Sequence, residues 1–549
     1  MNLLKLTATT IALTTLAGCG GSGSESTSPP QTVSTGSTPP PTASTVISGK
    51  LTFDRVPHKL TSGLDYANTV RNPIRGVVIE AVNASGDVIS EDISNSQGDY
   101  SLTVDSNSDV RLLVKAQLFS DDTAKWNFSV TDNTQGNQLY ALQGSLASSG
   151  ANSRQTRDLH AGHGWTGESY GEARSAAPFA ILDSVYTAVE KFVEIDPAIN
   201  FPALELRWSV NNKTQIGVRA EGRIGTSAYA PDDDGGVIYL LGEEGRDTDE
   251  YDQHVILHVW GHYFEHRLSR SDSIGGFHSL NDRLDARVAF SEGWGNALSA
   301  IITGDPIYRD SSGANQDSGF SFNIETGALS NPGWFNEASI GSIIYEVFND
   351  PSNLSDNRSA GLGSLYDVMS SDAYKNTPVF TTIFALADGL RRNLPGRAST
   401  IDTLLERHSI SGDGPDGNGE RNSGAIRSAL PVYKEVRLNG ASTQLCSVDD
   451  AGLFNKLGNR EFIILNLEAE QEVQMSLLKT MGDENRDPDF NIWQGRELIH
   501  QAISSAQGEE VFETRLPAGE YVIEVFDFFN ISGTGTKRGD SCYNFTVTG

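Results

Sequence analysis

Hydrophobic and polar residues alternate near both ends of the chain and follow a longer period in its middle. Residues 46–118 contain short alternating runs separated by turn signals such as Gln97-Gly98-Asp99, which favours the strands of a small β-sandwich. Residues 431–549 alternate in the same way and predict a second sandwich. From about 250 to 410, apolar residues recur every three to four positions, as they do on one face of a helix. We therefore expect a multidomain protein with an N-terminal β-sandwich, a central α+β and mainly helical core, and a C-terminal β-sandwich.

Two of the expected helices can be placed by their ends. The first ends near Leu268 and begins after Asp247 or Thr248, where acidic residues suit the positive end of the helix dipole. The second covers residues 286–303, because Asp285 is a good N-terminal cap and a Gly-Asp-Pro sequence stops the helix.

The start of the chain indicates targeting to the cell envelope. Residues 6–16 are apolar but fewer than the about 20 that cross a hydrocarbon layer, so residues 1–18 are interpreted as a signal peptide. This segment leads into Leu-Ala-Gly-Cys, which resembles a bacterial lipobox and implies that Cys19 carries lipid; an ordinary cleavage site is the alternative. Gly20 rather than Asp follows the cysteine, and the resemblance to Gram-negative lipoproteins then implies sorting to the outer membrane. We expect a bacterial envelope protein that reaches the membrane through a lipid anchor only.

The remaining cysteines predict a disulfide. Residues 19–45 are mostly Gly, Ser, Thr and Pro and predict a tether behind the lipidated cysteine. Beyond it, the only cysteines are Cys446 and Cys542. In an oxidising compartment this pair favours one bridge inside the C-terminal module, although two free buried thiols are the alternative.

The charge balance narrows the possible partners. The chain has 41 Lys and Arg residues against 71 Asp and Glu residues, which gives a formal net charge of −30. Affinity for nucleic acid comes mainly from Lys and Arg at phosphates, so this composition excludes a nucleic-acid partner.

Half of the ten histidines gather in one short segment and suggest a metal site. They are His254, His258, His262, His266 and His278. On a helix, His258 and His262 lie about 40° and about 6 Å apart, so their imidazoles can share a cation such as Zn²⁺. Glu292 lies in an apolar stretch of the second helix, where an unpaired carboxylate is costly to bury and a metal would remove that cost. Asn296, one turn later, could accept a hydrogen bond from a ligand imidazole.

The motif "HVILHVWGHYFEH…DRLDARVAFSEGWGNA" resembles the active site of gluzincin metallopeptidases. The resemblance implies zinc ligands at His258, His262 and Glu292, with Asn296 standing where the thermolysin-like branch has an Asp behind the ligands. It also implies that an edge strand, Val237–Leu241, aligns the substrate.

Two flanking resemblances complete the expected domain order. "SGKLTF…PIRGVVIEAV…SQGDYSLTV" at 46–118 resembles a carboxypeptidase regulatory-like domain. "LPAGEYVIEV" resembles a strand of prepeptidase C-terminal domains and assigns residues 431–549 to such a sandwich. Residues 119–430 remain for the zinc metallopeptidase-like domain.

One position departs from the family pattern. The family has Glu after the first ligand histidine, as the general base that takes a proton from zinc-bound water, whereas this chain has Val259. Valine cannot accept a proton. Glu265 is a possible substitute, although an ordinary ion pair or a contact behind the ligands is its other interpretation.

Two hypotheses about function follow from this departure. The first is a surface-anchored zinc metallopeptidase-like lipoprotein whose hydrolysis of peptides is weak or lost. The second is a non-catalytic, zinc-binding pseudopeptidase that holds a peptide or protein ligand or acts in adhesion.

Overall fold

The computed structural model describes residues 43–231, 233–327, 330–349, 360–532 and 535–549. The signal peptide at 1–18, the lipidated Cys19 and most of the tether at 19–45 lie outside these residues and stay predictions. In the described part of the chain, no helix is long and apolar enough to span a bilayer.

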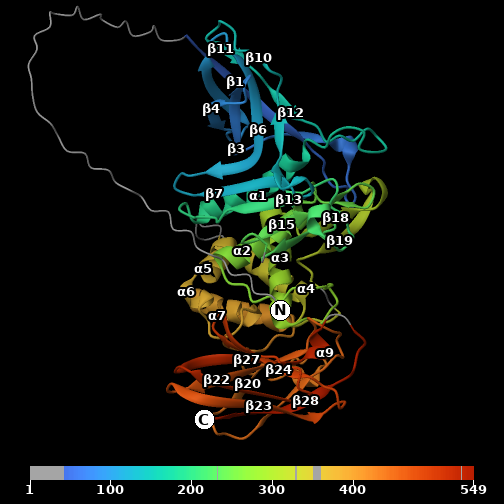
Figure 1. The fold of residues 1–549 in the computed structure, drawn as a ribbon, viewed down its shortest axis with the longest axis vertical. Helices are drawn as coiled ribbons and strands as arrows, with labels where there is room; N and C mark the ends of the chain where they lie inside the picture. Colours follow the sequence, from blue (N-terminus) through green and yellow to red (C-terminus); the bar gives the residue numbers. More distant parts are fainter. Residues whose placement is uncertain (1–42, 232, 328–329, 350–359, 533–534) are drawn as a thin grey trace, which may run out of the picture. The chain divides into compact units, whose positions relative to one another are not determined.

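Two sheets form the N-terminal part (Figure 1). In the smaller one, β1 (Ser44–Arg55) pairs with β2 (Val70–Pro73), β5 (Asp99–Asp105), β11 (Arg154–Thr156) and β12 (Leu159–Ala161). The larger sheet has the order β14 (Ala228–Ala230), β15 (Val237–Leu240), β13 (Leu204–Trp208), β7 (Trp126–Asp132), β6 (Asp109–Ser120), β3 (Val77–Asn83) and β4 (Val88–Ile93), with β8 (Gln138–Leu139), β9 (Ala141–Gln143) and β10 (Ala147–Ser148) beside it. Every second residue of β5 is buried, as strand alternation requires.

The larger sheet overturns the predicted fold class. Strands account for 36% of the described residues and helices for only 25%, so the centre is not a mainly helical core. β6 runs across residues 118 and 119 without a break and pairs with β7, which lies parallel to β13. One hydrophobic core extends from Ile47 to Leu457. The sequence pattern indicates strands near β13 and β15, but a short, almost wholly buried strand carries no sign of its partner, so their pairing with the N-terminal strands was missed.

The described residues contain nine α-helices. They are α1 (Ala177–Ile195), α2 (Gln253–Leu268), α3 (Ala286–Thr303), α4 (Glu337–Asn349), α5 (Ala360–Met369), α6 (Asp372–Lys375), α7 (Ile383–Asn393), α8 (Ala398–Arg407) and α9 (Phe528–Ile531). α2 packs on one side of α3 and α4 on another, so α3 is buried along almost its whole length.

The structure confirms the predicted bounds of α3. The Asp285 side chain accepts a hydrogen bond from the backbone N–H of Arg287, and Gly304 ends the helix with a positive φ of 69°. That φ falls in the left-handed region, where glycine carries no steric penalty.

The predicted start of α2 is wrong, although its end at Leu268 is right. Asp247–Thr248 form a strand instead, so α2 begins only at Gln253. This strand belongs to a small antiparallel sheet with the order β16 (Gly242–Glu243), β17 (Asp247–Thr248), β18 (Ile307–Ser312) and β19 (Ser318–Asn323). Pairing of β17 with β16 and β18 therefore takes the acidic segment away from the helix.

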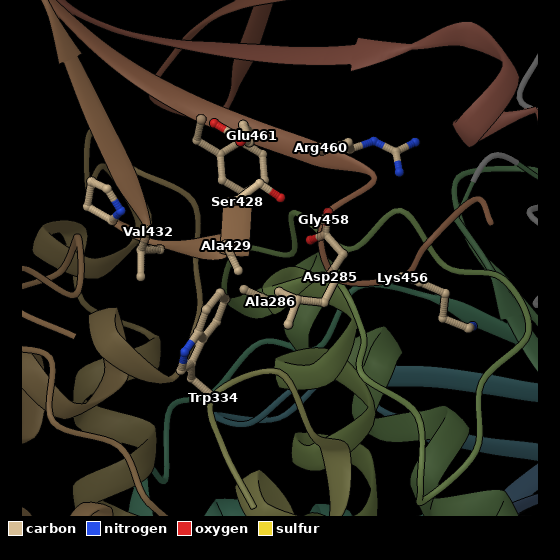
Figure 2. Close-up of a pocket in the computed structure, with 13 residues that line it drawn as sticks. Asp285, Ala286, Trp334, Ser428, Ala429, Val432, Lys456, Gly458, Arg460 and Glu461 are labelled. Carbon is tan, nitrogen blue, oxygen red and sulfur yellow. The ribbon is translucent and has the colours of Figure 1, made fainter. Parts of the chain in front are cut away.

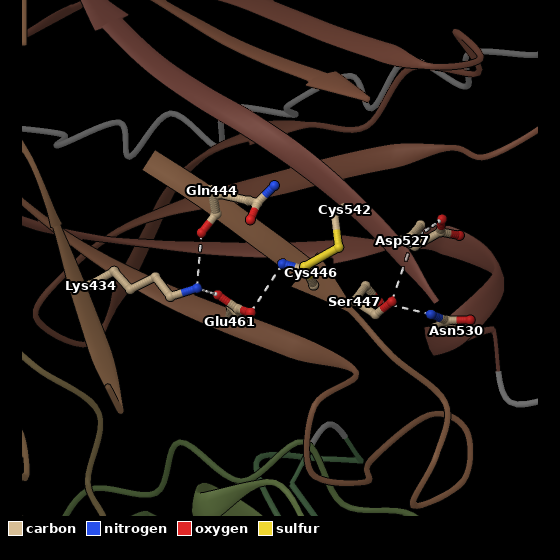
Figure 3. Close-up of a disulfide and its surroundings, with 9 residues drawn as sticks. Lys434, Gln444, Cys446, Ser447, Glu461, Asp527, Asn530 and Cys542 are labelled. Atoms are coloured by element: carbon tan, nitrogen blue, oxygen red, sulfur yellow. Dashed lines mark hydrogen bonds and ion pairs between the residues drawn. A yellow bond between two sulfur atoms is a disulfide. The ribbon is translucent and has the colours of Figure 1, made fainter. Parts of the chain in front are cut away.

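The C-terminal part is a β-sandwich with its own hydrophobic core (Figure 1). One sheet has the order β20 (Tyr433–Val436), β22 (Arg460–Leu467), β27 (Gly519–Asp527), β24 (Pro488–Gln494) and β25 (Glu497–Ala502). The other has the order β21 (Thr443–Ser447), β28 (Ser541–Thr548), β23 (Gln471–Met481) and β26 (Glu509–Leu516). A disulfide joins Cys446 of β21 to Cys542 of β28, the pair that the cysteine count indicates (Figure 3).

A buried ion pair joins the start of α3 to this sandwich. The Arg287 guanidinium lies 2.9 Å from Asp285 and 2.7 Å from Glu524 of β27. Burial alone would raise the pKa of Glu524, but Arg287 and Arg460 hold it below its usual value. Beside this junction, Asp285, Ala286 and Trp334 face residues of the sandwich around a cavity of about 20 Å³ (Figure 2). That is room for about one water molecule.

We expect the disulfide to stabilise the sandwich measurably. The bridged cysteines are 96 residues apart, and closing so long a loop restricts the unfolded chain. Replacing both cysteines by Ala should lower the free energy of unfolding by about 2–4 kcal/mol in denaturant titrations. The reduced wild type is the matched control. Equal unfolding midpoints for the oxidised, reduced and substituted proteins would contradict this prediction.

Candidate metal centre

Two glycines let α2 and α3 approach each other closely. A Cβ atom on Gly261 would lie 3.1 Å from the Cα atom of Gly295. A Cβ atom on Gly295 would lie 2.9 Å from Nδ1 of His258, closer than real Cβ contacts allow. The absence of side chains at these two positions therefore brings the histidines of α2 within reach of Glu292 on α3.

Three side chains converge where the helices meet. His258, His262 and Glu292 each offer one ligand atom, and these atoms lie within 4.8 Å of one another. Oε2 of Glu292 lies 3.0 Å from Nε2 of His258 and 3.5 Å from Nε2 of His262. Burial raises the pKa of Glu292, but the charges of His262 and His278 outweigh it and bring the pKa well below its usual value. The carboxylate is therefore ionised at this junction.

In both imidazoles Nε2 lies toward Glu292, and Nδ1 makes a hydrogen bond on the opposite side of the ring. Nδ1 of His258 lies 2.9 Å from Oδ1 of Asn296, an acceptor, so Nδ1–H donates this bond. Nδ1 of His262 lies 3.0 Å from Oγ of Ser291, which itself donates to Oε2 of Glu265 at 2.6 Å. Burial also lowers the pKa of His258, which favours its neutral form. In its neutral form, each ring therefore keeps its proton on Nδ1 and would present the Nε2 lone pair to a cation bound between the two rings and Glu292.

Glu265 lies behind His262 rather than at the centre. It is buried, and burial raises its pKa to about 8. Its Oε2 accepts the hydrogen bond from Ser291, and it makes no ion pair among the described residues. This geometry makes Glu265 an orienting residue for His262.

Val259 leaves the general-base position without a polar group. The side chain is 3% exposed and belongs to the main hydrophobic core. Trp260 beside it is fully buried. The position therefore offers packing and no proton acceptor.

The expected edge strand is not an edge. β15 pairs with β13 on one side and with β14 on the other, where Ala228, Tyr229 and Ala230 lie opposite Tyr239, Ile238 and Val237. A substrate cannot add itself as a strand where β14 already occupies that edge. Sequence reasoning missed β14 because a three-residue strand shows no alternation.

His278 and Glu337 also belong to this centre, although the sequence analysis assigns no role to either residue. Nε2 of His278 lies 3.2 Å from Oε2 of Glu292, and its Nδ1 lies 2.6 Å from Oε2 of Glu337 in the first turn of α4. His278 comes from the irregular connection between α2 and α3. In the sequence, only its place in the histidine cluster pointed to His278. A segment without helical or strand periodicity does not show in which direction its side chains lie.

No family model matches this chain, and no curated protein matches it. Solved structures with some likeness include the pre-peptidase C-terminal domain of a collagenase from Bacillus anthracis, at 10% identity over 21% of this chain and 93% of that chain, with a TM-score of 0.16. CorA, a surface-associated copper-binding protein of Methylomicrobium album BG8, matches at 10% identity over 21% and 96%, with a TM-score of 0.15. PliG, a periplasmic lysozyme inhibitor of Aeromonas hydrophila, matches at 19% identity over 21% and 98%, with a TM-score of 0.14. Likeness at this level carries no argument about function.

In the metal-free protein, His278 should stabilise the fold only at lower pH. Burial lowers its pKa, but the charge of Glu292 and the bond to Glu337 outweigh burial and raise the pKa to about 9. Since this exceeds the unfolded value of about 6.5, the contribution is complete below about pH 6.5 and is lost as the pH rises through about 9. Across that window, chelator-treated wild type should lose about 1–3 kcal/mol more unfolding free energy than His278→Gln.

Urea titrations at about pH 6 and about pH 9.5 measure this difference. Parallel pH dependence of the two proteins would show that His278 carries no such contribution.

Proposed function

We propose that this chain is a zinc-binding, metallopeptidase-like lipoprotein of the bacterial envelope in which peptide hydrolysis is weak or lost. The observation that carries the proposal is the convergence of His258, His262 and Glu292 within 4.8 Å, on two helices whose glycines permit it. The lipid anchor and the outer-membrane location rest on the first twenty residues of the sequence alone.

The donor set suits zinc. Two imidazole nitrogens and one carboxylate oxygen are the ligands of many zinc hydrolases. In each histidine here, the other ring nitrogen, Nδ1, already has a hydrogen-bond partner. When bound, zinc supplies a Lewis acid and lowers the pKa of a coordinated water. The chain's own contribution is orientation, since Asn296 and Ser291 fix the two rings.

Three observations support weak or absent hydrolysis. Val259 supplies no proton acceptor, and Glu265 is turned toward Ser291 behind His262. β14 occupies the edge of β15 that a substrate would need. Losing a positioned general base typically costs about 10²–10⁴-fold in rate.

The occupied edge favours a second candidate, a non-catalytic role in binding a peptide or protein ligand. In that case the metal would hold α2 and α3 together, and the partner would bind elsewhere on the chain. The two candidates share the zinc site and differ in whether restoring a base restores hydrolysis.

Purified protein should contain about one zinc ion per chain after dialysis. His262→Ala and Glu292→Gln should abolish retention, because each removes one of three protein ligands. Asn296→Ala should weaken zinc affinity by about 10–100-fold, since it leaves Nδ1 of His258 without its acceptor. Elemental analysis and competition with a chromophoric chelator measure both effects.

His254→Ala is the matched control on the same helix. Its Nε2 lies 3.1 Å from the backbone oxygen of Asp305, away from the three ligands, so zinc content should not change. Retention of zinc by His262→Ala would refute the site.

Val259→Glu tests the missing base directly. On a short peptide, which needs no strand pairing, the variant should raise kcat/KM by at least about 100-fold over wild type. Val259→Gln, of the same size but without a base, should stay at the wild-type level. Equal activity of all three proteins would mean that more than the base is missing and would favour the binding role.

A further inference from the structure

A second group of carboxylates lies at the N-terminal end of α2, outside the zinc site. Asp247 of β17, Asp249 and Asp310 of β18 each place one carboxylate oxygen within 4.8 Å of the others. Asp249 stands in the connection that leads from β17 into α2. The group therefore joins two strands of the small sheet to the start of the helix that carries His258 and His262.

Asp249 is buried, and Asp247 and Asp310 are partly buried beside it. Asp249 is 2% exposed, and although its Oδ2 accepts a bond from Ser227, its Oδ1 has no hydrogen-bond partner. Oδ1 of Asp247 also lacks a partner. Among the described residues, no Lys, Arg or His forms an ion pair with any of the three. A buried carboxylate oxygen without a donor costs free energy, and three carboxylates this close together also repel one another.

Neighbouring acidic groups add to the uncompensated negative charge of these three carboxylates. Asp252 is fully buried nearby, but it has its own donors in the backbone N–H and hydroxyl of Ser311, and His58 lies 3.2 Å away. Burial, followed by repulsion from Asp252 and Asp247, raises the pKa of Asp310 well above its usual value. Burial and Asp252 likewise raise the pKa of Asp247 to about 7. The group lacks a positive charge, and the described chain does not provide one.

We propose that Asp247, Asp249 and Asp310 bind a calcium ion that fixes the small sheet to the start of α2. Oxygens bound to one Ca²⁺ at 2.3–2.6 Å lie no more than about 5 Å apart, which agrees with the spacing here. The donors are all carboxylate oxygens, which a hard cation prefers, whereas zinc favours nitrogen and sulfur. Mg²⁺ demands near-ideal octahedral geometry, while Ca²⁺ accepts an irregular set completed by backbone oxygens or water.

The acidic turn at 233–234 provides a contrast. Asp233 forms an ion pair with Arg219 and accepts a bond from Tyr239 at 3.1 Å, and Asp234 lies 2.5 Å from Arg207. These charges are already balanced by the chain. Asp233 is therefore a suitable control position for the calcium group.

The test compares thermal unfolding of the full-length protein in EGTA, in about 5 mM Ca²⁺ and in about 5 mM Mg²⁺. Calcium should raise the Tm of wild type by about 2–6 °C, and magnesium should do much less. Asp249→Asn should lose the calcium response. In EGTA, however, it should be as stable as wild type or more stable, because it removes a repelled, unpartnered carboxylate.

Asp249→Asn should thus be less stable than wild type in calcium but at least as stable in EGTA. That reversal distinguishes a metal ligand from an aspartate that only stabilises the fold. Equilibrium dialysis with ⁴⁵Ca²⁺ should find about one ion per chain in wild type and in Asp233→Asn, and none in Asp249→Asn or Asp310→Asn. The calcium response should persist in His262→Ala, so failure of the zinc site and failure of this site are distinguishable. No calcium response in wild type, an equal response in Asp249→Asn, or an equal response to magnesium would overturn the proposal.

Discussion

The metal centre depends on the close approach of α2 and α3. Gly261 and Gly295 face each other at the crossing, and a methyl group at Gly295 would enter the space of the His258 ring. Helix axes usually lie 8–10 Å apart depending on the side chains between them, and glycine at the contact permits the lower end of that range. The chain therefore places ionisable side chains inside a protein core, where they need partners.

Those partners form a chain of hydrogen bonds behind the ligand side chains at the crossing. Asn296 and Ser291 accept hydrogen bonds from Nδ1 of His258 and of His262, and Glu265 in turn accepts a hydrogen bond from the Ser291 hydroxyl. At the start of α3, Arg287 forms ion pairs with Asp285 and Glu524, which tie the helix to the C-terminal sandwich. Because removing one member of a buried polar network leaves its partner unsatisfied, such networks hold a single arrangement of the helices.

Sequence reasoning located what local periodicity encodes. The ends of α3 and the disulfide could be foreseen, and the helical spacing of His258 and His262 selected the two histidines that face Glu292. It failed where long-range pairing decides. The fold class was wrong because β13 and β15 join the N-terminal strands in one sheet, and the edge strand was wrong because β14 covers it. His278 and Asp249 come from irregular segments, whose side-chain directions no period defines, and Asp247 lies in a strand of only two residues.

The central claim is that one zinc ion occupies the crossing of α2 and α3. Anomalous diffraction measured on both sides of the zinc absorption edge, from crystals of untreated protein, tests it most directly. The account predicts one zinc peak between Nε2 of His258, Nε2 of His262 and Oε2 of Glu292, with each ligand atom at about 2.0–2.2 Å. A map without a peak there, or with its zinc peak at another group of side chains, would contradict it.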